Sequence, residues 1–399
     1  MLTSSLAAPA RLTVVTSACE IFFCLSLCLA LAGCASPSSI IACGGPANGG
    51  TSVPLCINPN PLLYASTTSN QILPFSISHT SGALTAVTPS GGPANSGSIA
   101  NQEIFLMFAD PANDQVDTYQ VNGDGTLMAV SGSPFSLGAV SGGPTGILFS
   151  DEGFFYASEP NGTIVGFSAT GVGSLTTAVP NSPFAAGTAP GPMTTATLSL
   201  SAPGPNALYA VDTANPSGGV LAYTIDGSGS LTPVVGSPFL ALPNSEANSL
   251  LVVNSYLVVA VTSSASLTDM GKVAVLSIDP SSGALTPVPG SPFTVGNNPG
   301  ALAMDSSNHL FVLNNADHTV TAFGVASNGM LTAIGTPVAA GTATGGMAAD
   351  PPYLYVADTN AGNILTLSID ASTGALAPAG STPVTSPPLE LTVVSTPAI

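Results

Sequence analysis

The side chains that could do acid–base chemistry in this sequence are few, and nearly all of them are acidic. Twenty Asp and Glu residues stand against two basic residues, Arg11 and Lys272. Asp305 and Asp350 each follow a run of small apolar residues, and a carboxylate there could act as a general base that takes a proton from water. Three histidines fall near expected loops or strand ends, where a lone His is more often solvated than catalytic: His79, His309 and His318.

A denser group of acids raises the question of a calcium site. Asp110, Asp114, Asp117 and Asp124 lie within the segment DPANDQVDTYQVNGDG. Their spacing does not match an EF-hand loop, so we interpret the segment as a solvated acidic loop. No zinc-type spacing of Cys and His and no G-x-S-x-G nucleophile motif occurs in the sequence. We therefore expect no metal and no other cofactor, with calcium as the alternative.

Several polar residues follow apolar runs at a similar offset, and two roles are open to them. Asx side chains that follow a strand commonly cap the next turn by accepting backbone N–H groups. A set repeated around a fold would also form a ring on one face, where ligand contacts could be made. The candidates are Asp110, Asp212, Asn314 and Asp358, with Ser66 and Ser158 at the same offset.

The elements that would position these residues follow from a phrase that recurs along the chain. Residues 272–293 read KVAVLSIDPSSGALTPVPGSPF, in which an alternating apolar run, turn residues and a second short run predict a β-hairpin. Repeats of roughly 43–56 residues with four short strands each are typical of a β-propeller. The sequence therefore predicts an all-β, seven-bladed β-propeller of four-stranded antiparallel blades in residues 53–399. The leucine that follows the turn marks the copies at Leu84, Leu127, Leu175, Leu231, Leu285, Leu331 and Leu376.

The four strands of a blade can be assigned as a to d from the centre outward. Strand b is the apolar run before each acid or amide, and strand c carries a large residue that we expect in the core. Strand d is expected to end at Ser-Pro-Phe, because a proline is tolerated on an outer edge strand. Residues 389–394 have the character of a strand a, and we expect them to close the ring in preference to residues 53–57. The large residues of strand c are Phe75, Tyr119, Phe167, Tyr223, Leu276, Phe323 and Leu367.

Strands that read LYVAD or LFVLN, followed by G-x-L-T and GSPF, give the sequence a family resemblance. It resembles the lactonase-like seven-bladed β-propellers, which include the bacterial phosphogluconolactonases and are close to the YVTN-repeat propellers. The resemblance covers about residues 53–399 and implies the same fold. It also implies lactone hydrolysis as an activity, although motifs of this kind specify the fold better than the chemistry.

The first residues have the pattern of an export signal. The apolar segment 21–32 ends in Leu-Ala-Gly-Cys, which resembles the bacterial lipobox, in which the Cys is acylated. We expect residues 1–33 to be a lipoprotein signal peptide and Cys34 to carry the lipid. Residues 34–52, rich in Ser, Gly and Pro, then form a flexible tether. An ordinary cleaved signal and a membrane anchor are the alternatives.

Two further cysteines follow the lipobox. Cys43 and Cys56 could form a disulfide in an oxidising compartment, or they could remain thiols. We expect the protein to be exported and held at the outer membrane or cell surface.

The charge balance restricts the function. A nucleic-acid partner is excluded because Lys272 is the one basic residue after the leader and cannot neutralise a row of phosphates, and a phosphorylated substrate is disfavoured for the same reason. We expect a binding module at the cell envelope, anchored to the membrane through Cys34 and holding a neutral carbohydrate or lactone or a protein partner. A lactonase-like hydrolase of a neutral lactone and a purely structural envelope protein are the alternatives. Few cations also mean few ion pairs to lose, so acid should destabilise the fold little.

Overall fold

The computed structural model describes residues 61–88, 97–102, 104–138, 143–150, 152–169, 173–198, 206–214, 219–240, 245–263, 270–342 and 345–394. The predicted signal peptide and tether, the lipidation site Cys34 and the predicted pair Cys43 and Cys56 lie outside these residues. All described strands belong to one compact unit, Thr51–Ile399. Within the described part of the chain, no helix is long and apolar enough to cross a membrane.

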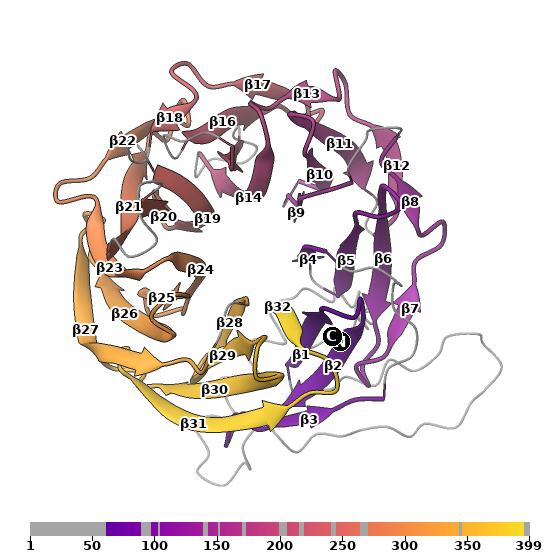
Figure 1. Ribbon diagram of the computed structural model, residues 1–399. Helices are drawn as coiled ribbons and strands as arrows, with labels where there is room; N and C mark the ends of the chain where they lie inside the picture. Colours follow the sequence, from indigo (N-terminus) through magenta and orange to yellow (C-terminus); the bar gives the residue numbers. More distant parts are fainter. Residues whose placement is uncertain are drawn as a thin grey trace, which may run out of the picture. The chain divides into compact units, whose positions relative to one another are not determined.

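The described strands form seven antiparallel sheets arranged around a common centre (Figure 1). In each sheet the four main strands lie in the order a, b, c, d, so the predicted seven-bladed β-propeller is confirmed. From a to d, the strands are β32 (Pro388–Val394), β1 (Leu62–Thr67), β2 (Ile72–Ile77) and β3 (Leu84–Ala86) in blade 1; β4 (Ile99–Gln102), β5 (Phe105–Asp110), β6 (Gln115–Val121) and β7 (Leu127–Ala129) in blade 2; β9 (Gly146–Phe149), β10 (Phe154–Glu159), β11 (Thr163–Ala169) and β12 (Leu175–Ala178) in blade 3; β14 (Pro190–Thr197), β15 (Asn206–Asp212), β16 (Gly219–Ile225) and β17 (Leu231–Pro233) in blade 4; β19 (Ser245–Val253), β20 (Tyr256–Ser263), β21 (Met270–Ile278) and β22 (Leu285–Pro287) in blade 5; β24 (Pro299–Met304), β25 (His309–Asn314), β26 (Thr319–Val325) and β27 (Leu331–Ala339) in blade 6; and β28 (Met347–Asp350), β29 (Tyr353–Asp358), β30 (Asn363–Ile369) and β31 (Leu376–Pro383) in blade 7.

This topology defines two faces. The turns between strands b and c and the connections from d to the next a lie on one face, which we call the b–c face. The turns between a and b and between c and d lie on the other, the a–b face. Every marker leucine of the sequence repeat is the first residue of a strand d.

The core lies between neighbouring blades. Strands b are buried along most of their length, because each is covered on both sides by the adjacent sheets. For example, Leu62 and Tyr64 of blade 1 pack with Leu106 and Phe108 of blade 2 in one apolar cluster. The large residues of strand c are buried as predicted, except Phe167, which is partly exposed.

The last strand of the chain closes the ring. Strand β32 pairs antiparallel with β1, with Leu62 opposite Val394 and Ala65 opposite Leu391. The innermost strand of blade 1 therefore comes from the C-terminal end, and the prediction for residues 389–394 is confirmed. In Figure 1 the yellow β32 lies beside the indigo β1.

The Ser-Pro-Phe phrase does not end strand d, which corrects the sequence interpretation. In blades 2 to 5 the chain leaves the ladder after strand d, and the Phe begins a short extra strand that pairs again with strand c: β8 (Phe135–Ser136), β13 (Phe184–Ala185), β18 (Phe239–Leu240) and β23 (Phe293–Asn297). Across each gap the Ser hydroxyl accepts the strand c N–H that would otherwise lack a partner, as from Val275 to Ser291 Oγ at 2.9 Å. The same bond runs to Ser133, Ser182 and Ser237.

Tyrosines of strand b link several blades to the next blade. The Tyr209 hydroxyl donates to the carbonyl oxygen of Gly283, in the c–d turn of the following blade, at 2.8 Å. That glycine has a φ of +74°, which favours glycine. Burial raises the pKa of Tyr209, which keeps its hydroxyl a neutral donor. Equivalent bonds join Tyr64 to Gly125, Tyr156 to Gly229 and Tyr355 to Gly82.

Candidate functional site

Most b strands end in a polar residue on the b–c face, and the observed strands correct which residues share that position. Thr67 and Glu159 end their b strands, whereas Ser66 and Ser158 lie one residue earlier. Ser66 and Ser158 were grouped with the strand-ending residues by counting back from strand c. The b–c turns differ in length, so such an offset does not identify the end of strand b. The residues that end strand b in this way are all buried: Thr67, Asp110, Glu159, Asp212, Asn314 and Asp358.

Two of the four predicted ligand contacts cap their own turn. Asp110 Oδ1 accepts the N–H groups of Ala112 and Asn113, both at 3.2 Å. Asp358 Oδ1 accepts the N–H of Ala361 at 3.2 Å. The predicted Asx-type capping of the b–c turn is confirmed at these two positions.

The other two predicted ligand contacts stabilise a different segment. Asp212 accepts the N–H groups of Thr188 and Ala189, at 3.1 and 3.0 Å, and Asn314 Oδ1 accepts that of Gly296 at 3.0 Å. Both partners lie in the connection from strand d to the next strand a. The side chains of all four positions are therefore engaged with backbone, and contact with a ligand stays a prediction for them.

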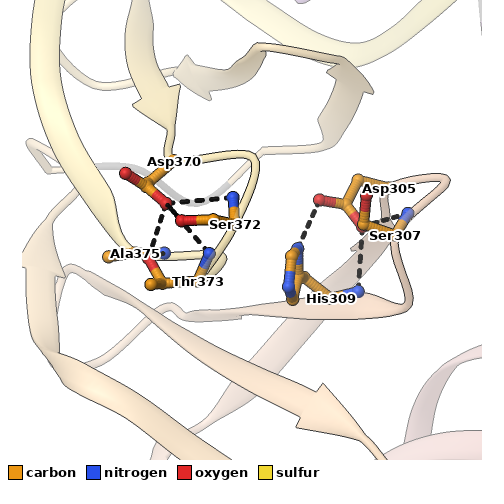
Figure 2. Close-up of polar contacts among 7 residues, drawn as sticks. All are labelled: Asp305, Ser307, His309, Asp370, Ser372, Thr373 and Ala375. Carbon is orange, nitrogen blue, oxygen red and sulfur yellow. Dashed lines mark hydrogen bonds and ion pairs between the residues drawn. The ribbon is translucent and has the colours of Figure 1, made fainter.

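Asp305 lies in the a–b turn of blade 6, where Figure 2 shows it beside His309 and opposite the Asp370 turn of blade 7. Its Oδ2 atom lies 2.7 Å from His309 Nδ1, and its Oδ1 atom accepts the N–H groups of Ser307 and His309 at 2.9 Å each. The His309 ring packs against Gly374, where an added Cβ would lie 2.5 Å from the ring.

The contact with Gly374 explains why a ring side chain stands at position 309. In four other blades the first residue of strand b is an aromatic that covers the equivalent glycine, as Tyr353 covers Gly82 and Phe154 covers Gly229. The Asp305–His309 pair thus caps a turn and fills a contact between blades, and catalysis by Asp305 stays a prediction.

Asp350 ends strand a of blade 7 on the a–b face. Its Oδ2 atom is buried and has no hydrogen-bond partner among the described residues. Burial raises the pKa of this carboxyl, and the nearby His79 lowers it to a smaller extent. Asp350 therefore remains a candidate for proton transfer, and His79 is exposed beside it.

The acids considered as a calcium site separate in the fold. Asp110, Asp114 and Asp117 lie on the b–c side of blade 2, whereas Asp124 lies in the c–d turn on the other face and accepts from Thr126. No group of three His, Cys, Asp or Glu residues suited to a metal ion occurs in the ranges that the structure describes. The expected absence of a cofactor stays a prediction.

A groove opens on the a–b face between blades 4 and 5. Its volume is about 760 Å³, and its lining includes Thr195, Thr197, Leu198, Asn254 and Pro280. None of its lining residues is ionisable. The groove could hold a neutral molecule, but it offers no general base.

The centre of the ring holds a carboxylate that the sequence analysis did not single out. Glu390 lies on β32, the innermost strand of blade 1, and its side chain is reached by solvent. Its Oε2 atom accepts the N–H of Ile99, the first residue of β4, at 3.0 Å, and its own N–H donates to Ser66 Oγ at 3.2 Å. Two residues further along β32, Thr392 Oγ1 donates to Asn101 Oδ1 at 3.0 Å. The bonds to Ile99 and Asn101 join blades 1 and 2, and the bond to Ser66 joins the closing strand to β1 within blade 1.

The surroundings of Glu390 perturb its ionisation. Although solvent reaches the side chain, the strands of the ring surround it, and this desolvation raises its pKa; the N–H of Ile99 lowers it to a smaller extent. An accessible carboxylate with a raised pKa at the centre of a fold has the properties of a general base.

Glu390 also interrupts a regular pattern. Each strand a places a large apolar residue opposite the same position of its strand b, as Leu391 lies opposite Ala65 in blade 1. The residue immediately before it is small or Pro in six blades and Glu in blade 1. This leaves the space around the carboxylate lined by short side chains. The other six residues are Ser98, Gly146, Pro192, Ser249, Ala301 and Gly346.

Comparisons with known proteins agree with this architecture. The model of the lactonase family, described as a 7-bladed β-propeller, matches residues 256–388. No curated protein matches the sequence. The resemblance to lactonase-like propellers, first drawn from the repeat motifs, is therefore confirmed by the family model over the C-terminal blades.

Solved structures extend the likeness to the whole ring. A periplasmic gluconolactonase from Pseudomonas aeruginosa is 18% identical, with a TM-score of 0.66 over 85% of this chain and 99% of that one. A candidate 6-phosphogluconolactonase from Bacteroides fragilis is 17% identical, with a TM-score of 0.64 over 84% and 98%. A protein from Lactobacillus plantarum is 17% identical, with a TM-score of 0.64 over 84% and 99%. At these identities the likeness shows the fold.

Proposed function

We propose that this protein hydrolyses a neutral lactone at the centre of the ring, with Glu390 as the general base. The observation that carries the proposal is the solvent-reached Glu390 carboxylate, whose pKa is raised and whose Oε2 atom accepts the N–H of Ile99, while Ser66 Oγ accepts the backbone N–H of Glu390. The lactonase family model and the fold of the P. aeruginosa gluconolactonase support the reaction class.

The chemistry needs one carboxylate and one water molecule. Glu390 takes a proton from water, and the water oxygen attacks the lactone carbonyl carbon to form a tetrahedral intermediate. The ring C–O bond then breaks, and the ring oxygen takes the proton back from Glu390 to give a hydroxy acid. The Asn101 side-chain amide, whose Oδ1 atom accepts the Thr392 hydroxyl, would supply N–H donors to the oxyanion.

The charge of the inner strands defines the substrate class. The described inner strands contain no Lys or Arg, and Lys272, the only basic residue after the leader, lies on β21 with its Nζ donating to Thr294. A phosphorylated lactone needs cations to hold its phosphate, whereas a neutral lactone does not. We therefore propose an uncharged, hydroxyl-bearing lactone.

Turnover of neutral lactones, including gluconolactone, tests the proposal, with spontaneous hydrolysis in buffer subtracted. Wild-type turnover should fall by about 100-fold or more in Glu390→Gln, because general-base catalysis typically contributes about 10²–10⁴-fold. Asp305→Asn should keep wild-type activity, since Asp305 caps the a–b turn of blade 6 and does not contact Glu390 in the proposed site. Wild-type turnover no faster than buffer, or loss of activity in Asp305→Asn but not in Glu390→Gln, would remove this assignment.

A binding module at the cell envelope is the second candidate, and the groove between blades 4 and 5 favours it because no ionisable side chain lines it. It would bind a neutral carbohydrate without converting it. Calorimetric binding without turnover would select this function, and neither binding nor turnover would select a purely structural envelope protein. Membrane attachment belongs to both functions and is tested by mass spectrometry of the mature N-terminus, which should be an acylated Cys34.

A further inference from the structure

Glu159 is a buried carboxyl that the proposed reaction does not use. It ends strand b of blade 3, and its relative exposure is 0%. Neither of its oxygens has a hydrogen-bond partner among the described residues. A buried ionised carboxylate without donors is costly, so this position favours the protonated form.

The groups that face Glu159 increase this cost. Burial raises the pKa of Glu159, and repulsion from Asp114, in the b–c turn of the neighbouring blade 2, raises it further, to about 7. Beyond that turn, Asp117 on β6 is itself buried, and desolvation together with Asp110 raises its pKa to about 6. The other described residues beside Glu159, in β11 and the connection into blade 3, are uncharged, so no described cation offsets these acids.

The turn that carries Asp114 also holds the connection between the two blades. The Asp114 carbonyl oxygen accepts the N–H of Leu137, a buried residue that begins the path from blade 2 to blade 3. Met107 and Val116 of blade 2 pack with Leu137, and with Phe155 of blade 3, in one apolar cluster. Repulsion at Glu159 therefore acts directly on the packing between these blades.

We propose that the contact between blades 2 and 3 is proton-sensitive: it closes when Glu159 is protonated and loosens on the b–c face when Glu159 ionises. The sign follows from linkage. An acid whose pKa is higher in the folded state binds its proton more tightly there, so stability is highest below its ordinary pKa of 4.5 and falls as the pH rises through about 7. The protein should be more stable at pH 5.5 than at pH 8.

Thermal unfolding at these two pH values tests the proposal with a matched pair of variants. The wild type should melt about 2–4 °C higher at pH 5.5 than at pH 8. Glu159→Gln should lose most of that difference by gaining stability at pH 8. Glu152→Gln, which changes an exposed glutamate of the same blade, should keep it. A Glu159→Gln variant that keeps the wild-type pH difference would overturn the proposal.

A local measurement keeps the test decisive if other acids dominate the global stability. Amide hydrogen exchange, corrected for the intrinsic effect of pH, should show faster exchange at pH 8 than at pH 5.5 for Asn113 and Leu137 in the wild type. The difference should vanish in Glu159→Gln and persist in Glu152→Gln. Equal corrected exchange at both pH values in the wild type would also overturn the proposal.

Discussion

The tyrosine bonds between blades allow a stability prediction with an internal control. Tyr209 and Tyr256 each donate from the hydroxyl to a carbonyl oxygen in the next blade at 2.8 Å, but the bond of Tyr209 to Gly283 is buried and that of Tyr256 to Ser327 is exposed. A Phe substitution removes the hydroxyl and keeps the ring at both sites. At Tyr209 it leaves a buried carbonyl oxygen without that donor, whereas at Tyr256 water can replace it.

The burial difference sets the expected magnitudes. Tyr209→Phe should lower the free energy of unfolding by about 1–2 kcal/mol, the cost of an unsatisfied buried polar group. Tyr256→Phe should cost less than about 0.5 kcal/mol, as exposed surface changes usually do. Urea unfolding followed by far-UV circular dichroism measures both, with an unchanged m-value showing that the fold is kept. Equal costs at the two sites would refute the reasoning that burial gives these bonds their strength.

Three further predictions concern the serine that bonds strand c beside strand d, the strand that closes the ring, and the stability of the fold at low pH. Ser291→Ala should destabilise by about 1–2 kcal/mol in urea unfolding because the Val275 N–H loses its acceptor, whereas Ser277→Ala, which removes an exposed hydroxyl on the same strand, should be nearly neutral. Deleting residues 386–399 should abolish cooperative unfolding in calorimetry because β1 loses β32; a truncated protein that melts like the full one would contradict the closure. In one c–d turn, the Ser281 hydroxyl and neighbouring donors lower the pKa of Asp279 to about 2. The ionised Asp279 therefore stabilises the fold above about pH 4, and this stabilisation is lost only as the pH falls toward 2. The melting temperature should therefore fall in that window, and a steep drop between pH 6 and pH 4 would contradict this.

Most of the fold is predictable from the sequence because its information is local and repeated. The marker leucines fall at a fixed place, the start of strand d, since one turn and one register produce them in every blade. The Ser-Pro-Phe phrase was recognised, but its role was misjudged. That role depends on Ser291 Oγ reaching a strand c amide across a gap, which neither propensity nor alternation encodes.

The candidate site was harder to predict because its residues differ from the repeat. Glu390 was recognised only as part of a closing strand, yet a signal was present: it is a Glu where the other six inner strands have a small residue or Pro. Glu159 was missed because the offset rule selected Ser158 instead. Asp305 stood out by its residue type, but its bonds to His309 and Ser307 assign it to a turn.

The pH dependence of lactone hydrolysis tests the central claim most directly. With Glu390 as the general base, kcat/KM for a neutral lactone should rise with pH through one ionisation that lies above the ordinary pKa of a glutamate, since desolvation raises that of Glu390. The Glu390→Gln variant should be slower and should lack this rise, while Asp305→Asn should retain it. An identical pH profile in wild type and Glu390→Gln would contradict the account.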